Sequence, residues 1–86
     1  MMSVGESEII AQAEDLQNFE AQEGGWRNNN RAMAALFGID FADNATDDQL
    51  KTFGRSIQAF AGGNDGAIGT RTIARMNENL AALDTA

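Results

Sequence analysis

The stretch GGNDGAIGTRT, residues 62–72, holds four of the nine glycines of this 86-residue chain. An aspartate before a glycine is typical of a tight turn, in which the carboxylate accepts nearby backbone N–H groups. We therefore expect Asp65 and Gly66 to turn the chain and Ile68 to anchor the loop in the core. Gly66 and Gly69 are expected to allow a positive φ or a close approach of backbone.

The segments on both sides of this stretch predict amphipathic helices. The first covers 47–61, and Thr46–Gln49 before it has the spacing of a capping box. Gly54 lies inside this helix at a cost of about 1 kcal/mol relative to alanine, which predicts close approach of another helix. The helix after the stretch is expected to be capped by Thr70 or Thr72. The apolar positions are Leu50, Phe53, Ile57 and Phe60 in the first helix and Ile73, Met76, Leu80 and Leu83 in the second.

The first part of the chain predicts two more helices. Ser3–Glu6 has capping-box spacing, Ser7 is a second candidate N-cap, and apolar residues then follow at helical intervals to about Gln22. Gly24–Gly25 is expected to end this helix. A short helix over 31–37 is expected next, with its N-cap among the preceding asparagines, Asn28–Asn30. The apolar positions are Ile9, Ile10, Ala13, Leu16 and Phe19 in the longer helix and Met33, Leu36 and Phe37 in the short one.

No segment shows the alternation of apolar and polar residues that is typical of a strand. The sequence therefore predicts an all-α fold, a small bundle of three main helices plus one short helix, formed by residues 1–86 as a single domain. Ile39 and Phe41, in the loop after the short helix, are expected to close one end of the core.

Composition narrows the possible chemistry. The chain has no cysteine and no histidine, which removes thiolate sites and the commonest general base and metal ligand. Asp40, Asp43, Asp47 and Asp48 could hold a divalent ion weakly, but turn formation and helix capping explain them, so no metal site and no cofactor is expected.

Net charge is −7, and the first 26 residues carry six acidic residues and no basic one. Binding of phosphates needs a basic face, so nucleic acid is not expected as a direct partner. A basic protein partner is compatible with this charge, and so is a purely solubilising role for it.

No signal peptide and no apolar run of about 20 residues is present, so no membrane contact is expected. The expected location is the cytoplasm of the producing cell or a virion, with cell-wall contact only after release.

Two ligand chemistries do not fit the stretch 62–72. A calcium loop needs oxygen ligands at alternate positions and a closing acid, whereas only Asn64 and Asp65 are suitable here. A phosphate-binding P-loop needs a lysine after its glycines, and none follows.

Residues 65–77, DGAIGTRTIARMN, resemble the peptidoglycan-binding segment of phage-type endolysins of glycoside hydrolase family 108. The shared pattern is Asp-Gly, two residues, Gly, two residues, Thr and then a helix of small apolar residues that reaches an Asn. The resemblance spans about residues 50–80, with Thr70 where the family usually has proline. It implies a non-catalytic module that binds cell-wall glycan, encoded by a phage or a bacterium. The implied binding residues are Asp65, Gly66, Gly69, Arg71 and Thr72. The same order of residues also suits a purely structural joint between two helices.

Glu23–Trp26, EGGW, is similar to a Glu-Gly-Gly-aromatic motif near the start of the same hydrolases, where the glutamate is taken as the catalytic acid. This similarity implies a minimal muralytic enzyme that uses Glu23 to protonate a glycosidic oxygen. The competing interpretation is a simple helix end. Trp26 is a stacking platform for a sugar, an anchor in a protein interface or a lid over the core.

Three functions therefore stand in order of preference. The first is the peptidoglycan-binding module. The second is an acidic, phage-encoded interaction protein, either a virion component or an inhibitor of a host enzyme or defence complex. The third is the hydrolase. Arg71 and Arg75, four residues apart, form a small basic spot that pairs with acids of the first helix or faces solvent.

Overall fold

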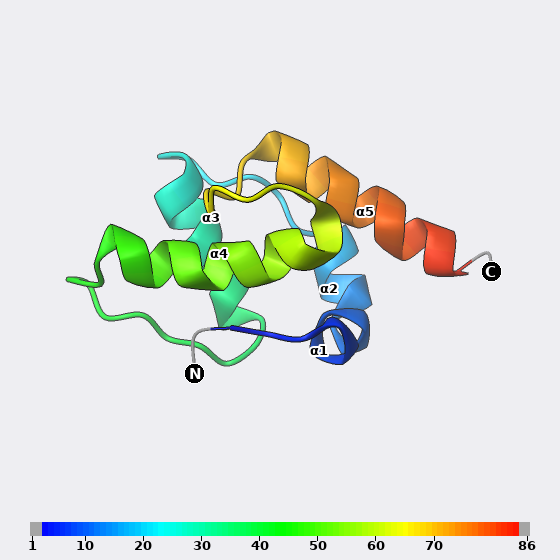
Figure 1. The fold of residues 1–86 in the computed structure, drawn as a ribbon, viewed down its shortest axis with the longest axis horizontal. Helices are drawn as coiled ribbons and strands as arrows, with labels where there is room; N and C mark the ends of the chain where they lie inside the picture. Colours follow the sequence, from blue (N-terminus) through cyan, green and yellow to red (C-terminus); the bar gives the residue numbers. More distant parts are fainter. Residues whose placement is uncertain (1–2, 85–86) are drawn as a thin grey trace.

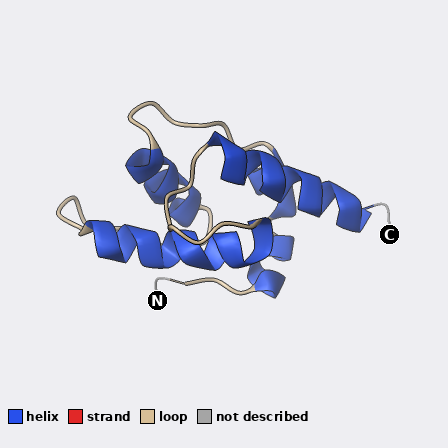
Figure 2. Ribbon diagram, turned by 45° about the horizontal axis from the view of Figure 1, so that its top comes forward, coloured by secondary structure: helices blue, strands red, loops and turns tan. Residues whose placement is uncertain are grey.

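A computed structural model describes residues 3–84, and within them five helices and no strand (Figures 1 and 2). In chain order the helices are α1 (Glu6–Ala11), α2 (Ala13–Gln17), α3 (Trp26–Ala35), α4 (Asp47–Ala61) and α5 (Thr70–Asp84). Helix α4 packs against α3 and α5, and α5 also packs against α2. The expected fold class, a small all-α bundle, is therefore confirmed.

Helix α4 begins and ends where the sequence predicts. The Thr46 hydroxyl accepts the backbone N–H of Gln49 at 3.2 Å, and the Gln49 side chain accepts the backbone N–H of Thr46 at 2.8 Å. This reciprocal pair satisfies two donors that the first turn of a helix leaves free. The helix ends at Ala61, before Gly62 with φ of 100°. Local interactions alone account for both ends of this helix.

The loop from Gly62 to Gly69 runs back along α4 before α5 begins (yellow in Figure 1). The carbonyl oxygen of Gly66 occupies the space that a Cβ atom on Gly54 would need. Our expectation that another helix approaches Gly54 is therefore confirmed only in part: the nearest neighbour is the backbone of this loop, while Asn30 of α3 contributes its amide nitrogen at 2.9 Å from that Cβ position. Gly66 itself has φ of 79°, and a Cβ there would lie 2.6 Å from Cβ of Lys51. The expected role of Gly66 is confirmed.

The predicted first helix is instead two short helices, and it stops at Gln17 rather than near Gln22. Gly5 is the N-cap of α1, so the predicted caps at Ser3 and Ser7 are wrong. The segment after Gln17 leaves the helical path because tertiary contacts hold it elsewhere: the backbone N–H of Gln22 donates to Asn29 Oδ1 at 2.6 Å.

Helix α3 starts five residues earlier than predicted, at Trp26, and ends at Ala35. The Gly24–Gly25 pair does not end a helix. Both residues have φ near 90°, and they turn the chain into α3, with Gly25 as its N-cap. The asparagines expected to cap a helix therefore lie inside one, and two of them, Asn29 and Asn30, are buried.

The core lies among all five helices of the described residues. Its largest fully buried side chains include Ile9, Leu16, Met33, Phe53, Ile57, Ile68, Met76 and Leu80. Ile39 and Phe41 are partly buried against this core, and the ring of Phe41 lies 6.4 Å from that of Phe53. Their expected role at one end of the core is confirmed. Ile10 and Leu83, expected on the buried stripes, are 44% and 46% exposed. In residues 3–84, every helix is too short or too polar to cross a membrane.

Candidate functional site

The loop between α4 and α5 is held by an amide clamp, which we define as Asn29 and Asn30 of α3 and Gln58 of α4. Asn30 is fully buried. Its Nδ2 donates to the carbonyl oxygens of Leu50, at 2.9 Å, and Gly66, at 2.8 Å, while its Oδ1 accepts the N–H of Ile68 at 3.1 Å. One side chain therefore joins α3, α4 and the loop, and every polar atom of its amide has a partner.

Asn29 extends the clamp to the other side of the loop. Its Nδ2 donates to the carbonyl oxygen of Ile68 at 2.9 Å, and its Oδ1 accepts the N–H of Gln22. Together the two asparagines bind both backbone groups of Ile68. Because Ile68 is itself fully buried, these groups would otherwise lack partners.

Gln58 binds the turn at Asp65. Its Oε1 accepts the N–H of Gly66 at 2.7 Å, and its Nε2 donates to Asp65 Oδ1 at 2.9 Å. Asp65 Oδ1 also accepts the N–H of Ala67 at 3.1 Å, as expected for an Asp-Gly turn. The Gln58 amide and then the Ala67 N–H lower the pKa of Asp65, against a smaller effect of desolvation. Asp65 is thus a carboxylate at neutral pH. The backbone N–H of Asp65 and the charge of Lys51 lower this pKa further, and the residue is exposed.

A shallow groove of about 310 Å³ lies beside this turn, where α4, the loop and α5 meet. We call it the junction groove; its lining residues are Gln58, Gly62, Gly63, Asn64, Asp65, Ala67, Gly69, Arg71, Thr72 and Arg75. Four of the residues implied by the family resemblance are therefore neighbours: Asp65, Gly69, Arg71 and Thr72. Gly66 does not line the groove, because it is buried where the loop lies against Lys51 of α4.

The two arginines of the junction groove, Arg71 and Arg75, are exposed. Within the described residues neither makes a hydrogen bond or an ion pair, so the possible pairing with acids of the first helix is not formed. The groove thus offers two cationic groups and the exposed carboxylate of Asp65 to a ligand.

Trp26 lies outside the junction groove. Its side chain is half-buried, and two cations contact its ring: the guanidinium of Arg27 lies 5.1 Å and the ammonium of Lys51 5.2 Å from the centroid. Arg27 in turn makes a bidentate ion pair with Asp47, at 2.8 and 2.7 Å, which lowers the pKa of that carboxyl group. Trp26 is therefore already engaged in cation–π contacts of the kind that hold surface aromatics in place.

Glu23 is exposed, in the turn before α3. Its carbonyl oxygen accepts the Asn28 side-chain amide at 2.7 Å, so the motif around it also fixes the turn. The apolar enclosure that a catalytic acid needs is missing around this side chain. No group of three potential metal-ligating side chains comes together in the part of the chain that the structure describes.

Sequence reasoning missed the amide clamp, and it assigned the wrong role to Gly69. Gly69 does not have a positive φ, and a Cβ on it would meet nothing within 4 Å. A signal for the clamp was present, since Asn29 and Asn30 each stand four residues before a buried residue, Met33 and Ala34. A polar residue at a buried helical position needs hydrogen-bond partners, and here the loop supplies them.

The chain matches no protein-family model, and comparisons with curated proteins and with solved structures give no match either.

Proposed function

We propose that this protein is a non-catalytic binding module whose junction groove binds peptidoglycan, the glycan of the bacterial cell wall. The observation that supports the proposal is the meeting of Asp65, Arg71 and Thr72 in one groove together with a second unpaired arginine, Arg75. All four residues belong to the segment that resembles the peptidoglycan-binding part of family 108 endolysins, and three of them, Asp65, Arg71 and Thr72, are binding residues that the resemblance implies.

The chemistry of the groove suits such a ligand. Sugar hydroxyls donate and accept hydrogen bonds, and the exposed carboxylate of Asp65 is an acceptor while the two guanidinium groups are donors. Peptidoglycan also carries carboxylates on its peptide stems. Arginine binds carboxylates through two parallel hydrogen bonds, and Arg71 and Arg75 have no partner within the described residues to compete.

Internal hydrogen bonds fix the loop and the Asp65 carboxylate of the groove in the absence of a ligand. Gln58 fixes the carboxylate of Asp65 at 2.9 Å, and the amide clamp fixes the loop on both sides. A site whose geometry is set in advance loses less entropy on binding. At about 310 Å³ the groove is at the small end of ligand sites, so we expect it to hold one sugar with its attached carboxylate rather than a long glycan.

Contact with peptidoglycan requires that the protein leave the cytoplasm of the producing cell or travel on a virion. The chain is proposed to be encoded by a phage or a bacterium, and lysis of the cell would bring it to the wall.

The test is co-sedimentation with purified cell-wall sacculi. Wild-type protein is expected in the pellet, and Arg71→Ala is expected to lower the bound fraction severalfold because it removes a ligand contact and no internal one. Arg55→Ala is the matched control: Arg55 is also an exposed arginine, and it lies on α4 outside the groove. Wild-type protein that stays in the supernatant would disprove the proposal.

A turbidity assay on the same sacculi separates binding from hydrolysis. The binding module is expected to leave the turbidity unchanged. Clearing by wild-type protein that is lost in Glu23→Gln would make the protein a hydrolase and would overturn the non-catalytic proposal.

A further inference from the structure

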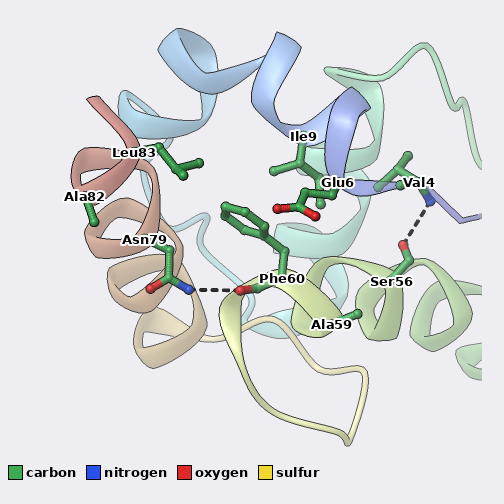
Figure 3. Close-up of a pocket in the computed structure, with 10 residues that line it drawn as sticks. Val4, Glu6, Ile9, Ser56, Ala59, Phe60, Asn79, Ala82 and Leu83 are labelled. Carbon is green, nitrogen blue, oxygen red and sulfur yellow. Dashed lines mark hydrogen bonds between the residues drawn. The ribbon is translucent and has the colours of Figure 1, made fainter. Parts of the chain in front are cut away.

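A larger and more apolar groove lies between α1, α4 and α5 (Figure 3). Its volume is about 520 Å³, within the roughly 300–1,000 Å³ that ligand sites occupy. Figure 3 shows Ile9, Phe60 and Leu83 turned toward the groove from the three helices, with the carboxylate of Glu6 beside Phe60. We call this the apolar groove; none of its lining residues belongs to the junction groove.

The groove consists of apolar surface that the fold leaves uncovered. Phe60 and Leu83 continue the buried stripes of α4 and α5, yet Phe60 is only half-buried and Leu83 is 46% exposed. Ile10, next to Ile9 on α1, is 44% exposed. Among the described residues, Ile10 and Leu83 are the large apolar side chains with the greatest exposure. They belong to α1 and α5, two of the helices that border this groove.

Two hydrogen bonds join the walls of the groove and do not depend on a ligand. The backbone N–H of Val4 donates to the Ser56 hydroxyl at 3.1 Å, and the Asn79 side-chain amide donates to the carbonyl oxygen of Phe60 at 2.9 Å. Both bonds appear as dashed lines in Figure 3. The groove is therefore a formed surface and not a gap between unattached segments.

We propose that the apolar groove binds an amphipathic helix of a basic partner protein. The groove residues of α4 are 56, 59 and 60, and those of α5 are 79, 82 and 83. Each set has the i, i+3, i+4 spacing of a helix face that packs against another helix. An extended peptide would need a sheet edge for its backbone, and the described residues contain no strand, whereas a helix satisfies its own backbone hydrogen bonds.

The acidic residues beside the apolar groove favour a partner helix that carries basic residues. Glu6 lines the groove, and Glu8 is exposed on the same short helix, α1. The first 26 residues contain six acids and no base, in a chain of net charge −7. A helix with leucine-like residues on one face and lysine or arginine beside them would fill the groove and pair with these acids.

The test uses a 14-residue helical peptide of leucine and lysine, and a second peptide in which glutamate replaces every lysine. Amide shifts of ¹⁵N-labelled protein are followed during titration, and Kd is measured at low and at physiological salt. The lysine peptide is expected to shift residues around Ile9, Phe60 and Leu83 and to bind more weakly at higher salt. The glutamate peptide is expected not to bind.

Two variants and one matched control locate the site. Leu83→Ser and Glu6→Gln, both at exposed positions, are each expected to raise Kd about fivefold or more. Asp43→Asn removes the same charge as Glu6→Gln from the loop before α4 and is expected to change Kd less than about twofold.

Three outcomes would overturn the proposal. Shifts centred elsewhere, or no saturable binding, would remove the site. Equal binding of the glutamate peptide would remove its preference for a basic helix. A dimer in analytical ultracentrifugation that Leu83→Ser dissociates would assign the groove to a second copy of this chain.

Discussion

Gly54→Ala provides the sharpest test of the contact between α4 and the loop that follows it. Helix propensity alone predicts that alanine stabilises α4 by about 1 kcal/mol. The structure predicts the opposite sign, because the new methyl group would occupy the position of the Gly66 carbonyl oxygen. It would also lie 2.9 Å from the amide nitrogen of Asn30. Both neighbours are held in place, one as backbone and one by three hydrogen bonds.

The magnitude follows from the groups that must move. Overpacking costs about 1–3 kcal/mol, and loss of the buried Asn30–Gly66 hydrogen bond costs about 1–3 kcal/mol more. Subtracting the propensity gain of about 1 kcal/mol leaves a net loss of about 3 kcal/mol. A domain of this size has a total stability of about 4–13 kcal/mol, so the variant is expected to fold with a Tm lower by roughly 12–24 °C.

The measurement is thermal and urea denaturation followed by circular dichroism at 222 nm. Thr52→Ala, two residues earlier on the exposed side of α4, is the control, and it is expected to raise stability by a few tenths of a kcal/mol through propensity. If Gly54→Ala is as stable as wild type or more stable, the loop does not press on α4 and the reasoning fails.

Three further predictions concern the clamp, the turn and the helix cap. Asn30→Ala should lower the free energy of unfolding by about 2–4 kcal/mol, because it leaves buried backbone groups without partners. The control, Asn28→Ala at an exposed position of the same helix, should lower it by about 1 kcal/mol or less. Urea denaturation measures both variants, and equal losses would contradict the clamp. The pKa of Asp65 is held below its ordinary 3.8 by hydrogen bonds, so its stabilisation is complete above about pH 4 and is lost as pH falls through the folded pKa. The Tm of wild type should therefore exceed that of Asp65→Asn most at neutral pH, and the difference should shrink as pH falls below about 4; a difference that stays constant from neutral to acid pH would refute the assignment. Thr46→Ala removes half of the capping box and should lower the unfolding free energy by about 1 kcal/mol in the same assay, and an unchanged value would mean that the cap is not formed in solution.

Only some of the binding residues that the family resemblance implies lie together in the structure. The order of residues predicts Asp65, Arg71 and Thr72 as binding residues, and they line one groove. It predicts Gly66 as well, yet the role of Gly66 is to let the loop lie against α4. The ring of Trp26, the single tryptophan of the chain, is contacted by Arg27 and Lys51.

Much of α4 and α5 could be predicted because the deciding interactions are local. The capping box joins Thr46 to Gln49, three residues away, and the Asp65 carboxylate reaches a backbone group only two residues away. Regular spacing of apolar residues then gives the direction in which each helix faces the core. Both partners of such an interaction lie within a few residues of each other in the chain, so the interaction can be predicted from a single sequence.

The clamp and the two grooves were decided by tertiary structure. Asn30 bonds partners 20, 36 and 38 residues away, and Asn29 bonds one 39 residues away. A run of three asparagines also fits a helix cap, which is why the bounds of α3 were predicted wrongly. The apolar groove has the same origin: the stripes ending in Phe60 and Leu83 are regular in sequence, but only the packing of α1 and α5 against α4 leaves those ends uncovered. The sequence by itself determined the helices around GGNDGAIGTRT and the turn within it, because neighbours along the chain stabilise them. Which polar side chains hold that turn, and which apolar side chains remain for a partner, depended on contacts between residues far apart in the chain.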